Sequence, residues 1–150
     1  MLRDKAAEYG TPLDEYEPML AEWVASYEPP VVTPEQKRTS LISAVTALRW
    51  EKETGGLTLP SGITVGTRTE DQNRITTVIA NAQLAGVTTV NFKAASGWVT
   101  LQLSEVQTLA AAIALHVQAC FSAERTHHEA IAALNDAALD SYDITTGWPQ

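Results

Sequence analysis

Two neighbouring residues in the last third of the chain are of types that do chemistry. His116 and Cys120 stand four positions apart, so on a helix they would share one face. Such a pair could form half of a metal site or an activated thiol. A zinc site needs about four ligands, and no second cysteine or suitably spaced histidine lies nearby. We therefore interpret the pair as core packing, with the thiol beside Val117 and Phe121.

His127-His128-Glu129 is the second candidate for chemistry. Adjacent histidines on a helix point about 100° apart, so they cannot chelate one ion well. The order of the three residues also differs from the HExxH motif of metalloproteases. The sequence therefore predicts a solvated helix face at this position.

Other catalytic patterns are absent from the sequence. No serine lies in a G-x-S-x-G elbow. Gly55-Gly56 and Gly62–Gly66 lack the lysine and hydroxyl residue that follow a phosphate-binding loop. No paired carboxylates stand out either. We therefore expect a protein that is not an enzyme, with no catalytic residue, no metal site and no cofactor.

Composition limits the class of protein. A chain of 150 residues can bury one ordinary core. No apolar run approaches the roughly 20 residues of a membrane span, and no apolar stretch follows Met1–Lys5, so neither a membrane segment nor a secretory signal is expected. The single cysteine suits a reducing compartment.

The net charge of −8 is concentrated at the N-terminus, because residues 1–30 hold seven acids and two bases, a net charge of −5. A nucleic-acid-binding protein needs a basic face. The nearest approach to one is Lys37-Arg38, so we expect no binding of nucleic acid.

The paired prolines in Glu28–Val32 mark a boundary between residues 1–32, an acidic N-terminal helical arm with a Pro-Pro linker, and a domain at residues 33–150. The arm has helical apolar spacing from Leu13 to Tyr27. Proline is tolerated in a first helical turn, so Pro18 places the start of this helix near Glu17.

The apolar side chains of the arm must pack against something, either the rest of the chain or another chain. The predicted partner-binding residues are Tyr16, Met19, Trp23 and Tyr27. Aromatic anchors on a helix that docks in a partner's groove are a recurrent mode of binding.

Three capping-box patterns predict three helix starts in the domain, at Thr33–Gln36, Thr69–Gln72 and Ser104–Gln107. The glycines Gly55-Gly56 and Gly86 predict the first two helix ends. The third helix is expected to break near Asn135.

Two hairpins are expected between the helices. The first pairs residues 57–59 with 63–65, and the second pairs residues 90–92 with 98–101. The predicted fold is α+β: three helices with two short β-hairpins, in the order helix, hairpin, helix, hairpin, long helix, plus the N-terminal helical arm. Four aromatic residues are expected to face the core: Trp50, Phe92, Trp98 and Phe121.

Several spaced blocks of the domain resemble a known family. These blocks are Ile63–Val65, Arg68–Gln72, Val90–Ala94, Ser96–Leu101, His116–Phe121, Tyr142–Ile144 and Gly147–Pro149. Residues from about Thr33 to Pro149 resemble a domain of unknown function found in tailed bacteriophages and prophages. That domain commonly forms the C-terminal part of tail-fibre, tail-assembly and related tail proteins.

The resemblance implies a function in a phage tail and no catalytic residues. The family usually has an acid and an arginine just before its second helix, where this chain has Arg68–Asp71. We expect a structural component of the bacteriophage tail, an adaptor associated with tail fibres or baseplate, made in the bacterial host cytoplasm and located in the virion. Its expected partners are other phage tail or tail-fibre proteins, with multiple copies per virion.

Two alternatives remain open. The chain could be a tail-fibre assembly chaperone, or an enzyme acting on envelope glycan, which would require an acid pair in a cleft. We further predict that Trp148 folds back onto the core, because it would otherwise be an exposed indole at a chain end.

Overall fold

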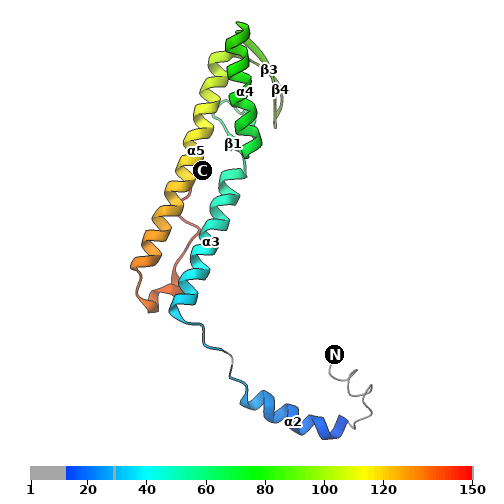
Figure 1. Cartoon of the computed structure of the whole chain (residues 1–150), viewed down its shortest axis with the longest axis vertical. Helices are drawn as coiled ribbons and strands as arrows, with labels where there is room; N and C mark the ends of the chain where they lie inside the picture. The colour runs from blue at the N-terminus through cyan, green and yellow to red at the C-terminus, as the bar shows by residue number, and fades with distance from the viewer. Residues whose placement is uncertain (1–12, 29, 150) are drawn as a thin grey trace. The chain divides into compact units, whose positions relative to one another are not determined.

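The computed structural model describes residues 13–28 and 30–149, without the side chains of residues 13–16. The chain forms two compact units, Met1–Val32 and Thr33–Gln150. The first unit contains helix α2 (Leu13–Ser26). The second contains α3 (Pro34–Thr54), β1 (Leu57–Thr58), β2 (Thr64–Val65), α4 (Thr69–Ala85), β3 (Thr89–Ala94), β4 (Gly97–Gln102), α5 (Leu103–Ala133) and the 3-10 helix η1 (Asp136–Ser141) (Figure 1). This mixture of helices and short antiparallel hairpins confirms the predicted α+β class.

The long helix α5 is common to both hydrophobic clusters of the second unit. Its first half meets α4 and the hairpins, and its second half meets α3 (Figure 1). The first cluster consists of Val65, Ile75, Ala94, Leu101, Val106, Leu109 and Ile113. The second consists of Val45, Ala123, Ile131 and Trp148. The unit is therefore organised along one helix.

Local capping sets the three predicted helix starts of this unit. At α3 the predicted capping box is confirmed, because Gln36 N donates to Thr33 Oγ1 over 3.2 Å and Thr33 N donates to Gln36 Oε1 over 2.8 Å. The other two helices begin earlier than predicted. Arg68 N donates to Asp71 over 3.3 Å and Gln102 N donates to Glu105 over 2.6 Å. A carboxylate is a stronger acceptor than an amide and suits the helix dipole, so the acids set these two starts.

The helix ends lie where the sequence predicts them. Helix α3 ends before Gly55 and α4 ends before Gly86, whose φ of 65° is in the left-handed region that favours glycine. Helix α5 ends at Ala133, and Asn135 then accepts a hydrogen bond from Ala138 N at the start of η1. The predicted break near Asn135 is therefore confirmed.

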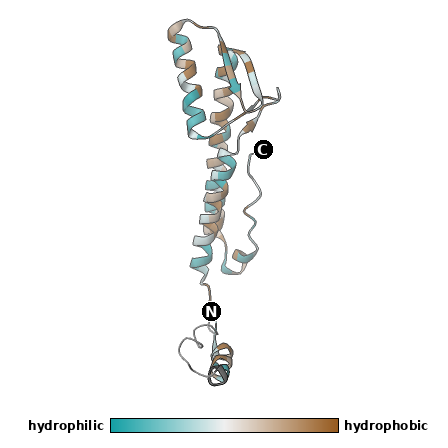
Figure 2. Cartoon of the chain, turned by 90° about the vertical axis from the view of Figure 1, so that its right-hand side faces the viewer, coloured by the Kyte–Doolittle hydropathy of each residue, from teal (hydrophilic) through white to brown (hydrophobic). Residues whose placement is uncertain are grey.

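Both predicted hairpins form, as separate two-stranded sheets. Leu57 pairs with Val65 in the first hairpin. The second hairpin has six residue pairs, from Thr89 with Gln102 to Ala94 with Gly97. Inward and outward residues alternate along β3 and β4, and Figure 2 shows this hairpin coloured by hydropathy. The inward residues of both hairpins enter the same cluster against α4 and α5.

The C-terminal residues return alongside α5 after η1, as both Figure 1 and Figure 2 show. Trp148 is 7% exposed and packs with Val45, Ala123 and Ile131. Its Nε1 donates to the carbonyl oxygen of Ile144 over 2.7 Å. The predicted fold-back of Trp148 onto the core is confirmed.

The start predicted for the N-terminal helix is wrong. Helix α2 begins at Leu13 rather than near Glu17 and continues through Pro18. Proline inside a helix removes one N–H donor, a local cost that the other bonds of a 14-residue helix can offset.

Candidate partner-binding surfaces

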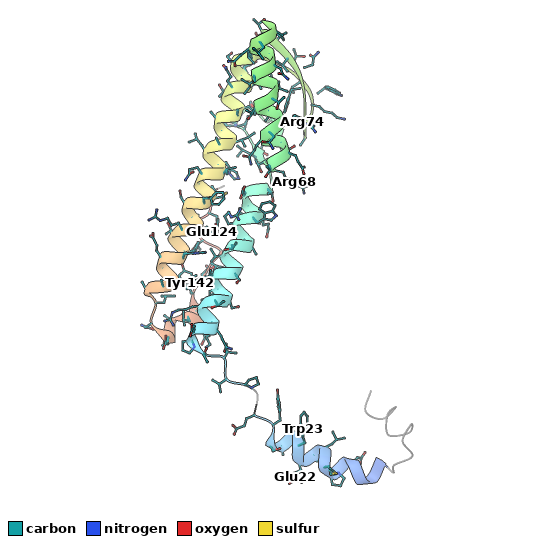
Figure 3. All side chains as sticks on the ribbon, viewed as in Figure 1. Glu22, Trp23, Arg68, Arg74, Glu124 and Tyr142 are labelled. Atoms are coloured by element: carbon teal, nitrogen blue, oxygen red, sulfur yellow. The ribbon has the colours of Figure 1, made fainter. Side chains whose placement is uncertain are left out.

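Helix α2 presents large apolar side chains to solvent. Met19, Trp23 and Tyr27 are 66%, 62% and 55% exposed, and we call these three residues the α2 row. They follow one another at intervals of four; Met19 and Trp23 lie on one side of α2, and Tyr27 is the first residue after the helix ends at Ser26. The rings of Trp23 and Tyr27 are 5.5 Å apart, and Figure 3 shows Trp23 on the helix. Tyr16, the fourth predicted partner-binding residue, lies outside the described side chains.

Acidic residues accompany the α2 row. The 14 residues of α2 include Asp14, Glu15, Glu17 and Glu22, and the helix has no lysine or arginine. Of these acids, Glu17 and Glu22 are exposed, as is Glu28 just beyond the helix. The helix thus combines apolar anchors with negative charge, which suits a partner surface that is apolar at its centre and basic at its rim.

A second exposed aromatic surface corrects the sequence analysis. Trp50 and Phe121 were expected to face the core, yet they are 56% and 45% exposed. The Arg49 guanidinium lies between them, 4.7 Å from the centre of the Phe121 ring and 5.6 Å from that of Trp50. The buried stripe of α5 includes Cys120, and Phe121 lies one position beyond it, about 100° around the helix.

Arg49 is held in place beneath these rings. Its guanidinium pairs with Glu53 and, over 3.1 Å, with Glu124, and the Arg49 side chain is only 13% exposed. Thr46 also donates to Glu124 over 2.7 Å. A buried arginine with two carboxylate partners joins α3 to α5, so the role of this cluster is structural.

Trp98 is the third aromatic residue whose predicted burial is wrong, at 73% exposed. It pairs with Lys93 across the hairpin, and the ammonium lies 5.6 Å from the centre of its ring. Phe92, which lies on the other face of the hairpin, packs against the core as predicted. Successive residues of a strand point to opposite faces of the sheet, so Phe92 faces the core and Trp98 faces solvent.

The packing interpretation of His116 and Cys120 is confirmed. Cys120 is fully buried, and His116 Nε2 lies 3.1 Å from the carbonyl oxygen of Lys52. A carbonyl only accepts, so Nε2 carries the proton. Burial raises the pKa of the Cys120 thiol, and the charge of Glu53 adds to the increase. The thiol is therefore neutral and shielded, which is the opposite of an activated nucleophile.

The predicted solvated face at His127 is wrong. His127 is 7% exposed, its Nε2 is 2.9 Å from the carbonyl oxygen of Thr146, and its Nδ1 is 2.8 Å from the Tyr142 hydroxyl. Its ring stacks on Trp148 with centres 5.3 Å apart. The returning C-terminal residues cover this face, and His127 lies on the same helical stripe as the buried Cys120, Ala123 and Ile131. His127 is thus a structural residue that holds the chain's end to α5.

The described residues contain no group of three or more His, Cys, Asp or Glu side chains that could hold a metal ion. Helix α5 is long and apolar enough by length and composition to cross a membrane, with a mean hydropathy of 1.4 over 18 residues. Polar residues interrupt the apolar ones along α5, so no uninterrupted apolar run in the sequence indicates this property. Of that 18-residue window, 28% is buried, and α5 packs against α3 and α4 and buries two histidines.

The second unit is thus an α+β unit built along one long helix, with two separate hairpins. The chain belongs to the family described as "Domain of unknown function (DUF4376)", whose model matches residues 36–146. The match covers nearly all of the second unit, and helix α2 lies outside it. No curated protein matches the chain, and no solved structure does.

Proposed function

We propose that this chain is a structural component of a bacteriophage tail, an adaptor associated with tail fibres or baseplate, and that α2 is its docking element. The observation that carries the proposal is the exposed α2 row. Met19 and Trp23 lie on a helix outside the family match, Tyr27 follows that helix directly, and all three belong to a compact unit separate from the domain.

The composition of the α2 row supports docking on a protein. Each aromatic side chain has about 150–250 Å² of surface to bury, and tryptophan and tyrosine are enriched among residues that dominate binding energy. Trp23 is 62% exposed, so at about 25 cal/mol per Å² the burial of its exposed part would contribute roughly 2–4 kcal/mol before the costs of association. A few such anchors are enough for a specific interface.

The resemblance of the second unit to phage tail domains supports the biological setting. In this proposal, the partner is another tail or tail-fibre protein with an apolar groove and a basic rim that complements Glu17 and Glu22. Tails are built with rotational symmetry, so several copies of the adaptor would occupy equivalent positions in each virion.

Quantitative mass spectrometry of purified virions tests the proposal. An adaptor is expected in multiple copies, in a fixed ratio to the other tail proteins. A chain that is abundant in infected cells but absent from washed particles would contradict the proposal and favour an assembly chaperone.

A further inference from the structure

One edge of strand β3 has no partner strand in the described chain. Strand β3 pairs only with β4. Just beyond the strands, Leu103 N donates to the carbonyl oxygen of Thr88 over 2.8 Å, so residues 88 and 103 form a hydrogen-bonded pair. Hydrogen-bonded and non-hydrogen-bonded pairs alternate along an antiparallel ladder. The main-chain groups of Thr89, Asn91 and Lys93 therefore point away from β4, toward the outer edge of β3.

Strand β2 meets this edge at one point, at the turn just beyond β3. Ala95 N donates to the carbonyl oxygen of Thr64 over 2.9 Å, which is the same outward direction. The chain then leaves the edge at Gly66 and enters α4. This single bond reaches the residue just beyond β3, and residues 89–93 have no strand on their outer edge in the described chain.

A groove of about 270 Å³ lies at this point, between β3 and the first turns of α4. Four consecutive residues, 92–95, line one wall, as expected where a groove follows the edge of a strand. Ile75 and Phe92 supply apolar surface, and both belong to the core of the unit. The groove therefore offers both main-chain hydrogen-bonding groups and an apolar floor.

The charge of the groove differs from that of the chain. Arg74 and Lys93 line it, although the whole chain has a net charge of −8 and the Lys93 ammonium also lies over the Trp98 ring. Asp71 also lines the groove, but it accepts the hydrogen bond of Arg68 N at the start of α4. In the described part of the chain, Arg74 has no carboxylate within ion-pair distance, and Figure 3 shows it on α4.

We propose that the edge of β3 binds an extended acidic segment of a partner protein as a third strand. Main-chain hydrogen bonds to residues 89, 91 and 93 would provide affinity, and the apolar floor and Arg74 would select the side chains. β3 has six residues, so a six-residue strand matches its length. This site is in the second unit and is independent of the docking role proposed for α2.

The test uses an acetylated six-residue peptide of alternating valine and glutamate, with a valine–lysine peptide as a control. Binding is followed by the NMR amide signals of Asn91 and Lys93 in the full chain. The valine–glutamate peptide is expected to shift both signals and to slow their exchange with solvent, and the lysine peptide is expected to have much less effect.

Two proline variants provide a matched pair. Asn91 and Thr100 face each other across the hairpin and share a side-chain hydrogen bond of 3.0 Å. Asn91→Pro and Thr100→Pro therefore lose the same bond, and each removes one outward N–H. Only Asn91→Pro removes it from the β3 edge. Because proline has no amide N–H, both proline variants are compared at the Lys93 signal. Asn91→Pro is expected to abolish the peptide shift of Lys93, Thr100→Pro to preserve it, and Arg74→Glu to weaken binding of the glutamate peptide selectively.

Three results would overturn the proposal. They are unshifted amides in the parent chain, equal binding by the two proline variants when circular dichroism shows both folded, and equal binding of the lysine peptide. Sedimentation could also reveal dimers that Asn91→Pro dissociates and Thr100→Pro does not. That result would replace the acidic partner with a second copy of this chain.

Discussion

Replacement of Trp148 by alanine should destabilise the second unit strongly. Trp148 is 7% exposed, so nearly all of its side chain leaves water on folding. A buried tryptophan side chain of about 150–250 Å² is worth roughly 4–6 kcal/mol at 25 cal/mol per Å². Compactness of the unfolded chain reduces this value, and measured tryptophan-to-alanine changes in cores cost about 3–5 kcal/mol.

The surroundings of Trp148 explain why the cost should spread beyond its own contacts. Its ring stacks on His127, and its Nε1 donates to Ile144. His127 in turn bonds Tyr142 and Thr146. Loss of the indole therefore loosens the attachment of the C-terminal residues to α5, and deletion of residues 148–150 should act in the same direction.

The assay is thermal and urea unfolding followed by circular dichroism, with Trp98→Ala as the matched control. Trp98 is 73% exposed, so its replacement should change stability by no more than about 0.5 kcal/mol. A loss of 3–5 kcal/mol corresponds to a decrease in Tm of roughly 12–20 °C for a unit of this size. Unfolding of Trp148→Ala that coincides with that of Trp98→Ala would refute the reasoning.

Three further predictions concern the other buried groups. Arg49→Ala leaves two carboxylates at a buried site and should cost about 3–5 kcal/mol in urea unfolding. The Arg125 side chain is 82% exposed, so Arg125→Ala should cost at most about 0.5 kcal/mol. Equal losses of stability in the two variants would contradict the burial argument. Burial raises the pKa of Tyr142, so the contribution of this tyrosine to stability is complete below the unfolded tyrosine pKa of about 10 and is lost as pH rises through the folded pKa. The parent should therefore lose more stability than Tyr142→Phe at alkaline pH. Parallel stability profiles of the two chains would count against this prediction. Cys120 is fully buried with a raised pKa, so iodoacetamide should alkylate it more slowly in the folded chain than in urea, and equal rates would be inconsistent with that burial.

The helices and hairpins were predictable because their signals are local. Capping patterns, glycines and strand alternation each act within a few residues, and the structure has all three predicted helices and both hairpins of the second unit. Errors at the starts of α4 and α5 came from assigning the cap to a hydroxyl residue when Asp71 and Glu105 were better placed to accept the cap hydrogen bond.

Burial was harder to predict, because it depends on which segments cover each face. Phe121 and Trp98 were misplaced although α-helical and strand periodicity contain enough information to place both outside. His127 also lies on the buried stripe of α5, four residues before Ile131, and the residues that return after η1 complete its burial. No local pattern specifies that return, apart from the tryptophan near the chain's end.

The candidate surfaces were likewise only partly predictable. The sequence identified Met19, Trp23 and Tyr27 as apolar residues on a helix with little core of its own, and the structure leaves all three exposed. It did not identify the β3 edge, because a free edge depends on the absence of a neighbouring strand. Their role in binding a partner remains a prediction.

The most direct test of the adaptor proposal is the incorporation of an α2 variant into phage particles. The variant combines Trp23→Ala with Tyr27→Ala, and Leu84→Ala, which changes a residue of α4 that is 87% exposed, is the control. Quantitative mass spectrometry of purified virions should find the parent chain and Leu84→Ala at equal copy number, and the α2 variant strongly depleted although its second unit unfolds normally. Equal incorporation of all three chains would contradict the proposal that α2 docks this protein in the tail.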